Sequence, residues 1–192
     1  YDDPHLVYPI STRGEYGLIQ AVQTGRNNKG TIFVFASGNG GYNFNNANSD
    51  GYANSMYTIA VAAVSARLTK VGYGEECACM VVSAPSSGFG YGMFTTDTVG
   101  PNGYSPNDYT HNFGGTSAAA PIISGVVALM LQANPDLNWR DVQEILLMTS
   151  RKNEPEHTDW IVNGAGMNFN HYFGAGVVDV IKAVNTSKTW NS

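Results

Sequence analysis

Charged side chains are scarce in this sequence. Only 13% of the 192 residues are charged, about half the globular average, whereas 43% are hydrophobic. A disordered chain needs the reverse balance, so we expect a folded domain. The 10 Lys and Arg residues against 15 Asp and Glu residues give a net charge of −5, which argues against a nucleic-acid partner. The length suits one sizeable domain and is short for two.

Long hydrophobic runs are absent as well. No apolar run reaches 18 residues, so we expect no membrane-spanning segment in this chain. Residues 1–9, YDDPHLVYP, have no basic start and no apolar core, so no signal peptide is visible. This segment does not look like a natural beginning of a protein.

Cysteine is limited to Cys77 and Cys79, which are separated by one residue. If the pair lies in an extended strand, we predict no disulfide between the two side chains. Two thiols are too few for a zinc site without histidines, and the four histidines show no ligand spacing. We therefore expect no metal bound by these cysteines.

Hydrophobic patterning predicts strands and helices in alternation. Apolar residues at helical spacing predict a helix over 14–25, which Gly25 ends. Continuous apolar runs predict fully buried strands over 31–35 and 57–64, and a third strand over 80–83. The stretch 85–112 holds five glycines and three prolines, which indicates loops and short strands.

Three further segments complete the predicted architecture. A helix from Ser117 to about Gln132 has scarcely any polar face, so we expect it to be buried. A second helix is predicted from an N-cap at Asn138 to about Thr149, and residues 174–184 read as a turn that enters a short helix. Buried strands that alternate with helices predict an α/β fold with a largely parallel sheet.

The segment 114–121, GGTSAAAP, opens the apolar helix and contains Ser117. A serine at that place lies near backbone N–H groups and the positive end of the helix dipole. Small residues on both sides let another chain approach closely, which suits a nucleophile whose oxyanion is held by its own N–H. An ordinary N-cap serine before a core helix explains the octapeptide equally well.

The segment 37–41, SGNGG, follows the first predicted strand and contains Asn39. The carboxyl edge of a parallel sheet is where α/β proteins place their sites. The amide of Asn39 could therefore supply a second oxyanion donor opposite Ser117. The alternative is a common Asn-Gly turn.

Together these two motifs resemble the subtilase superfamily, whose nucleophile segment reads GTSxxxP and whose oxyanion asparagine lies in SGN. The segments 30–41, 50–57, 138–143 and 173–179 resemble the kexin and furin branch, the proprotein convertases. The resemblance covers nearly all of the chain. It implies a subtilisin-like fold, a mostly parallel sheet flanked by helices, with residues 1–192 forming the C-terminal part, about 60%, of a catalytic domain.

The resemblance also implies catalytic and substrate-binding roles for individual residues. Ser117 would be the acylated nucleophile, Asn39 and the Ser117 N–H would hold the oxyanion, and the Thr116 hydroxyl would assist. Asp50 would lie at the base of the pocket for the basic residue before the cleaved bond, as a buried carboxylate that rewards Arg or Lys. Asp2 would lie beside that pocket.

A calcium ion under the pocket is implied as well. Asp2 and Glu75 match two family ligands, and Asn45 stands where the family has an aspartate. Asparagine still offers an oxygen but removes a charge, so we expect weaker calcium binding. Taken singly, the acidic side chains would read as ordinary surface charges.

Two family features are missing. The subtilase histidine lies in an HGT-type motif, and this sequence has no HG dipeptide, so the triad Asp and His would precede residue 1. His111, six residues before Ser117, reads as a loop histidine. The family disulfide partner of Cys77 corresponds to Ala47, so that bond should be absent.

The resulting hypothesis is a serine endopeptidase of the secretory pathway or extracellular space that cleaves precursor proteins after Arg or Lys. The chain by itself would be inactive. The alternative is a truncated, non-catalytic relative that binds basic peptides or regulates an intact protease.

Overall fold

A three-stranded parallel sheet forms the centre of the molecule. The computed structural model describes residue 7 and residues 9–191. Strands β1 (Phe33–Ala36), β2 (Thr58–Val64) and β3 (Met80–Pro85) lie side by side in this order. Val34 pairs with Ile59, and Val61 pairs with Val82. The predicted α/β fold with a parallel sheet is confirmed.

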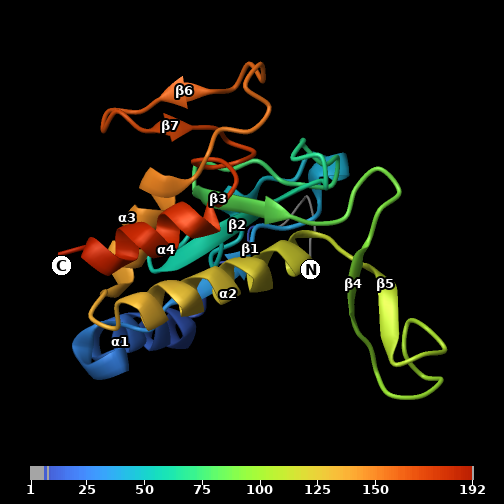
Figure 1. Ribbon diagram of the computed structural model, residues 1–192, viewed down its shortest axis with the longest axis horizontal. Helices are drawn as coiled ribbons and strands as arrows, with labels where there is room; N and C mark the ends of the chain where they lie inside the picture. The colour runs from blue at the N-terminus through green and yellow to red at the C-terminus, as the bar shows by residue number, and fades with distance from the viewer. Residues whose placement is uncertain (1–6, 8, 192) are drawn as a thin grey trace.

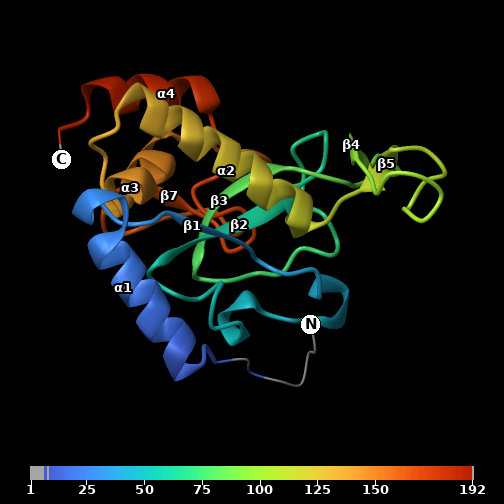
Figure 2. The ribbon, with the colours of Figure 1, turned by 90° about the horizontal axis from the view of Figure 1, so that it is seen from below.

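Helix α2 (Thr116–Ala133) packs across this sheet and contacts all three of its strands (Figures 1 and 2). Helices α3 (Trp139–Thr149) and α4 (Val180–Thr189) pack against each other; α3 also contacts β3, and α4 also contacts α2. Helix α1 (Thr12–Asn28) lies beyond the β1 side of the sheet (Figure 2).

Strand β2 divides the interior because its side chains alternate between two faces. Ile59 and Val61 pack in the main core with residues of α2, α3 and β3. Ala60 and Ala62 face the other way, into a smaller cluster that contains Cys77. Every residue of β2 is buried, as its apolar run predicts.

Strand β1 is less buried than its sequence predicts. All four of its residues are half-buried. Within the described residues β1 pairs with β2 alone, so one edge and part of each face stay uncovered. The opposite edge of the sheet is different, because residues 174–178 run beside β3 and donate from Ala175 N to Val81 O and from Val178 N to Ser83 O.

Helix α2 is also less buried than expected. Ile123, Val127 and Met130 are buried against the sheet, whereas Leu129 on the outer face is 46% exposed. Among the described residues, α2 is the one helix long and apolar enough to cross a membrane by length and composition. Its packing on all three strands identifies it as a core helix, with its apolar composition continuing onto an uncovered face.

The predicted helix boundaries hold closely. Helical geometry in α1 breaks at Gly25, where ψ is 154°. Asn138 caps α3 and forms a capping box with Asp141, as the sequence predicts. Asp179 caps α4, which continues to Thr189 and is longer than the predicted tail helix.

Two antiparallel hairpins extend from this body. Strands β4 (Met93–Thr96) and β5 (Tyr109–Phe113) form an arm that projects away from the sheet (Figure 1), and β6 (Ile161–Val162) pairs with β7 (Asn168–Phe169). Loops and short strands predicted for 85–112 are confirmed.

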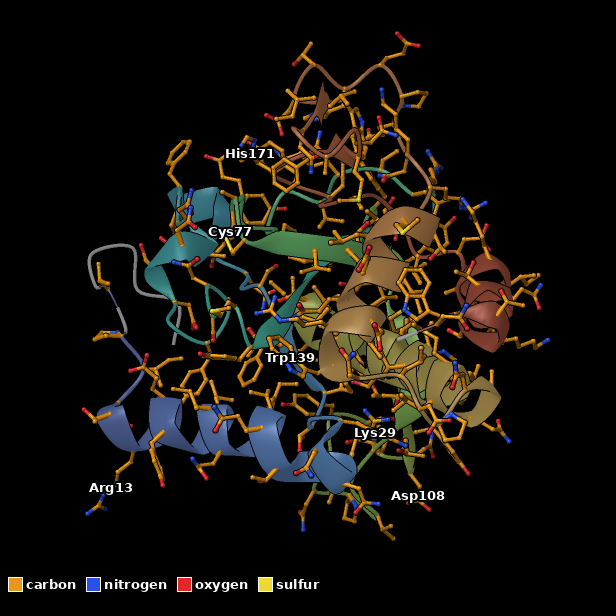
Figure 3. The ribbon with its side chains drawn as sticks, turned by 90° about the vertical axis from the view of Figure 1, so that its left-hand side faces the viewer. Arg13, Lys29, Cys77, Asp108, Trp139 and His171 are labelled. Atoms are coloured by element: carbon orange, nitrogen blue, oxygen red, sulfur yellow. A yellow bond between two sulfur atoms is a disulfide. The ribbon has the colours of Figure 1, made fainter. Side chains whose placement is uncertain are left out.

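The prediction of no disulfide between Cys77 and Cys79 is wrong. The structure joins them, with 5.0 Å between their α-carbons. Cys77 precedes and Cys79 lies within a turn that enters β3, so the strand assumed in the prediction is absent, and the turn brings the two α-carbons within the range of about 4.4–6.8 Å that a disulfide spans. Cys77 N also donates to His171 O, and both residues lie close together in Figure 3. Ala47 packs in the same cluster as Cys77.

Candidate active site

Ser117 lies in the first turn of α2 and is exposed. Gly115 is the N-cap, with φ at 74°, a conformation that favours glycine. The loop before the helix is fixed from β3: Ser86 Oγ donates to Gly115 O at 2.6 Å, and Gly115 N donates to Ser87 Oγ at 3.1 Å. Ser117 therefore lies at the positive end of the dipole of the 18-residue helix α2. The two hydrogen bonds to Gly115 hold the backbone that leads into this helix.

Asn39 is joined directly to the start of this helix. Its Oδ1 accepts hydrogen bonds from Thr116 N at 2.9 Å and from Thr116 Oγ1 at 3.1 Å. Because a backbone N–H donates to this atom, it is the oxygen of the amide, and the NH₂ is the donor end. Gly38 N donates to Thr116 Oγ1 at 3.2 Å, and Thr116 is fully buried. The two sequence motifs thus meet through Thr116.

Asp50 follows the turn η2 (Ala47–Ser49). Its Oδ1 accepts from Tyr52 N at 2.8 Å and from Ala53 N at 2.9 Å, which fixes the carboxylate beside the chain. The sequence interpretation expected a buried carboxylate, but Asp50 is exposed in this structure. The two backbone bonds position this charge without any cover from the described residues.

Glu75 and Asn45 meet at Gly40. Glu75 is only 6% exposed, and its Oε1 accepts from Gly40 N at 2.9 Å. The Asn45 amide also packs against Gly40, so closely that a β-carbon there would collide with it. Asn45 Oδ1 is buried and has no hydrogen-bond partner among the described residues. A buried carboxylate and an unsatisfied amide oxygen are ligands that a hard cation such as Ca²⁺ prefers.

The third expected ligand, Asp2, lies outside the described residues. In residues 7 and 9–191 no group of three His, Cys, Asp or Glu side chains could hold a metal ion. The roles of Asp2, Asn45 and Glu75 therefore stay predictions.

The described histidines are engaged away from Ser117. His111 packs on Phe94, with 4.6 Å between ring centroids. His171 Nδ1 lies 3.0 Å from Asp159 Oδ1, and His157 Nδ1 lies 3.2 Å from the Asn170 amide nitrogen. None of the three forms a hydrogen bond with Ser117, and His5 lies outside the described residues.

Sequence reasoning missed the serines that hold the site. Tyr73 Oη donates to Ser87 O at 2.8 Å, and Ser86 and Ser87 hold Gly115 as described above. Their position directly after β3, at the carboxyl edge of the sheet, is the signal that could have identified them.

Comparison with known proteins identifies the family of this chain. Residues 9–176 match the subtilase family. Proprotein convertase subtilisin/kexin type 7 of Mus musculus is 42% identical over 193 residues, covering 100% of this chain and 24% of that protein. Kexin of Saccharomyces cerevisiae is 39% identical over 192 residues, covering 100% and 23%.

A solved structure agrees in fold over the whole chain. The serine protease of Aeromonas sobria superposes with a TM-score of 0.87 at 25% identity, covering 100% of this chain and 43% of that one. The chain spans about a quarter of the length of the curated relatives just described.

Proposed function

The chain belongs to the subtilase family, and on that premise we propose that the protein is a kexin-like serine endopeptidase. Its proposed substrates are precursor proteins with Arg or Lys before the cleaved bond. The observation that carries the proposal is the bonding of Asn39 to Thr116, because it holds a strand-end amide at the N-terminus of the Ser117 helix.

The proposed chemistry is acyl transfer. Ser117 Oγ attacks the carbonyl carbon of the peptide bond and loses its proton to a base, and the carbonyl oxygen becomes an oxyanion. The Asn39 NH₂ and the Ser117 N–H donate to that oxyanion, the amine leaves with a proton, and water then releases the acyl group. We propose an imidazole as this base, and His111, His171 and His157 do not fit the role because each has another partner.

We also propose a calcium site and a cellular location for the protein. Asn45 and Glu75, with Asp2, would hold a Ca²⁺ ion that orders the loops beside Asp50. The unsatisfied Asn45 Oδ1 supports this assignment. The disulfide Cys77–Cys79 supports a secretory or extracellular location, because disulfides persist in oxidising compartments.

The test uses the complete protein that contains this chain and fluorogenic peptides with Arg before the cleaved bond. Ser117→Ala should abolish cleavage. Asn39→Asp keeps the oxygen that Thr116 needs but loses the donor, so kcat should fall about 100-fold or more with little change in KM. Ser124→Ala, on the exposed face of α2, is the matched control.

Two outcomes contradict the proposal. If cleavage survives the Ser117→Ala substitution, Ser117 is not the nucleophile. A complete protein that binds basic peptides without cleaving them would favour the non-catalytic relative, a reading that the separation of the described histidines from Ser117 supports.

A further inference from the structure

The β4–β5 arm, residues 86–113, exposes several aromatic side chains. The exposed aromatic residues of the arm are Phe89, Tyr91, Phe94, Tyr104, Tyr109 and Phe113. Large apolar side chains gathered on one projecting segment mark an interaction site rather than scattered surface residues.

Three rings of the arm form an ordered group. Phe94 on β4 stacks on Tyr109 of β5, with 5.6 Å between centroids and 16° between planes. His111 packs on Phe94 as well. These rings, together with residues 105–108, line a shallow hollow on the arm. Their mutual packing restricts the positions that the rings can take.

The charge of the arm has one sign. Asp108 lines the hollow, and its Oδ1 accepts from Gly100 N at 3.0 Å. The Asp97 carboxylate accepts hydrogen bonds from Thr98 N and Ser105 N at the tip of the arm. No Lys or Arg occurs anywhere between Lys70 and Arg140, so no side chain of this 69-residue stretch can neutralise these carboxylates as Lys or Arg would.

We propose that this hollow binds a basic side chain of the substrate, at a distance from the cleaved bond. Aromatic faces attract a guanidinium or ammonium group, and the Asp108 carboxylate adds charge complementarity. The inference rests on the proposed function, since it assigns a second contact to the same basic substrates. It does not depend on the substrate-binding role proposed for Asp50.

The arm is within reach of a peptide held at Ser117. Its base is bonded to the site, because Ser87 Oγ accepts from Gly115 N. His111 precedes Ser117 by six residues, and a chain extends at most about 3.3–3.6 Å per residue, so roughly 20 Å separates them at most. A substrate segment of six or more extended residues would span this distance.

The test compares matched peptides with the complete protein. All peptides carry Arg before the cleaved bond, and one of each pair also carries Arg six to eight residues away, on either side, where its partner has Gln. We expect kcat/KM to favour the second Arg about two- to five-fold on one side. Raising the salt concentration should shrink this ratio.

Two variants test the chemistry of the hollow. Phe94→Leu keeps an apolar side chain but removes the ring face, and Asp108→Asn keeps the acceptor for Gly100 but removes the charge. Each should bring the Arg-to-Gln ratio close to one. Tyr104→Leu removes an exposed ring of the same arm that does not line the hollow, so the ratio should persist. Circular dichroism establishes that each variant is folded.

A binding measurement separates this inference from the proposed function. The Ser117→Ala protein is titrated with the Arg and Gln peptides, and fluorescence anisotropy should show tighter binding of the peptide with the second Arg. If the protein cleaves after basic residues but neither assay shows a preference for the second Arg, the proposed binding in the hollow is wrong and the proposed protease function still stands. The proposed binding in the hollow is also wrong if Tyr104→Leu abolishes the preference for the second Arg. It is wrong as well if the arm instead mediates self-association of the protein.

Discussion

Tyr172 is a residue whose ionisation the fold controls. Its hydroxyl donates to Glu76, and this hydrogen bond, together with burial and the charges of Glu76 and Asp159, raises its pKa to about 12. Lys70 Nζ lies 3.3 Å from the centre of the ring. The fold thus keeps the phenol neutral at pH values where an ordinary tyrosine ionises.

This shift has a defined consequence for stability. A group whose folded-state pKa is raised contributes stability that is fully present below its unfolded pKa, about 10, and is lost as pH rises toward 12. Urea unfolding of the complete protein should therefore weaken between pH 10 and 12, and less so for Tyr172→Phe. Glu76→Gln should lower the Tyr172 pKa in absorbance titrations at 295 nm. An unchanged titration would remove Glu76 as the cause.

Asp50 is the residue on which the proposed specificity depends. Asp50→Asn keeps the oxygen that accepts from Tyr52 and Ala53 but removes the charge. Breaking a charge pair that substrate binding desolvates should lower kcat/KM about 30-fold or more for Arg and Lys substrates.

Two comparisons accompany the Asp50 measurement. Substrates with a neutral residue before the cleaved bond should be affected far less by Asp50→Asn. Asp136→Asn, an exposed carboxylate that pairs with Lys29, serves as the control variant. An equal loss on neutral and basic substrates would mean that Asp50 holds the turn and nothing more.

At the scale of elements, the loops after β1 and before β3 carry the proposed calcium ligands. Asn45→Asp should restore a carboxylate beside Glu75 and tighten Ca²⁺ binding to the complete protein. The measurement is calcium titration by isothermal calorimetry, with Asn48→Asp, on the same loop but exposed, as the control. Equal affinity of the Asn45→Asp and natural proteins would contradict the assignment.

Local patterns predicted the elements whose environment is set by their own residues. The capping box of α3 and the uniform burial of β2 follow from short runs of sequence. The half-burial of β1 and the uncovered face of α2 depend on which neighbours surround them, and no periodicity contains that information. The Cys77–Cys79 bond was missed because a turn, and not a strand, holds the two residues.

In the candidate site, too, the sequence predicted some residues and the structure was needed to identify the others. The SGN and GTS motifs predicted Asn39 and Ser117 as partners, but Thr116 as the residue that bonds them required coordinates. Ser86 and Ser87 carry no motif, and only the path of β3 brings them under Gly115.

At the scale of the molecule, the described residues leave apolar surface and a strand edge uncovered. β1 pairs on one side only, and Leu129 is exposed on α2. Expressed alone, this 192-residue chain should associate, which gel filtration would detect as species larger than 20.6 kDa. A stable monomer would contradict this expectation.

The isolated chain should also fail to hydrolyse peptides, because a serine hydroxyl is a weak nucleophile without a base. Treatment of the purified chain with a fluorophosphonate, beside a Ser117→Ala control, measures this directly. Stoichiometric labelling of Ser117 would overturn the expectation and make His111 the first residue to mutate.

Helix α2 would make the proposed reaction sensitive to packing far from Ser117, because a small tilt at one end of a long helix displaces the other end. Ser117 and Met130 are 13 residues apart on this helix, a length of about 20 Å at 1.5 Å per residue. A tilt of only about 3° around the Met130 end would swing the serine by about 1 Å, a misplacement that can cost about 100-fold in rate. The packing around Met130, far from Ser117, would therefore influence the rate of the proposed reaction as well as the stability of the fold.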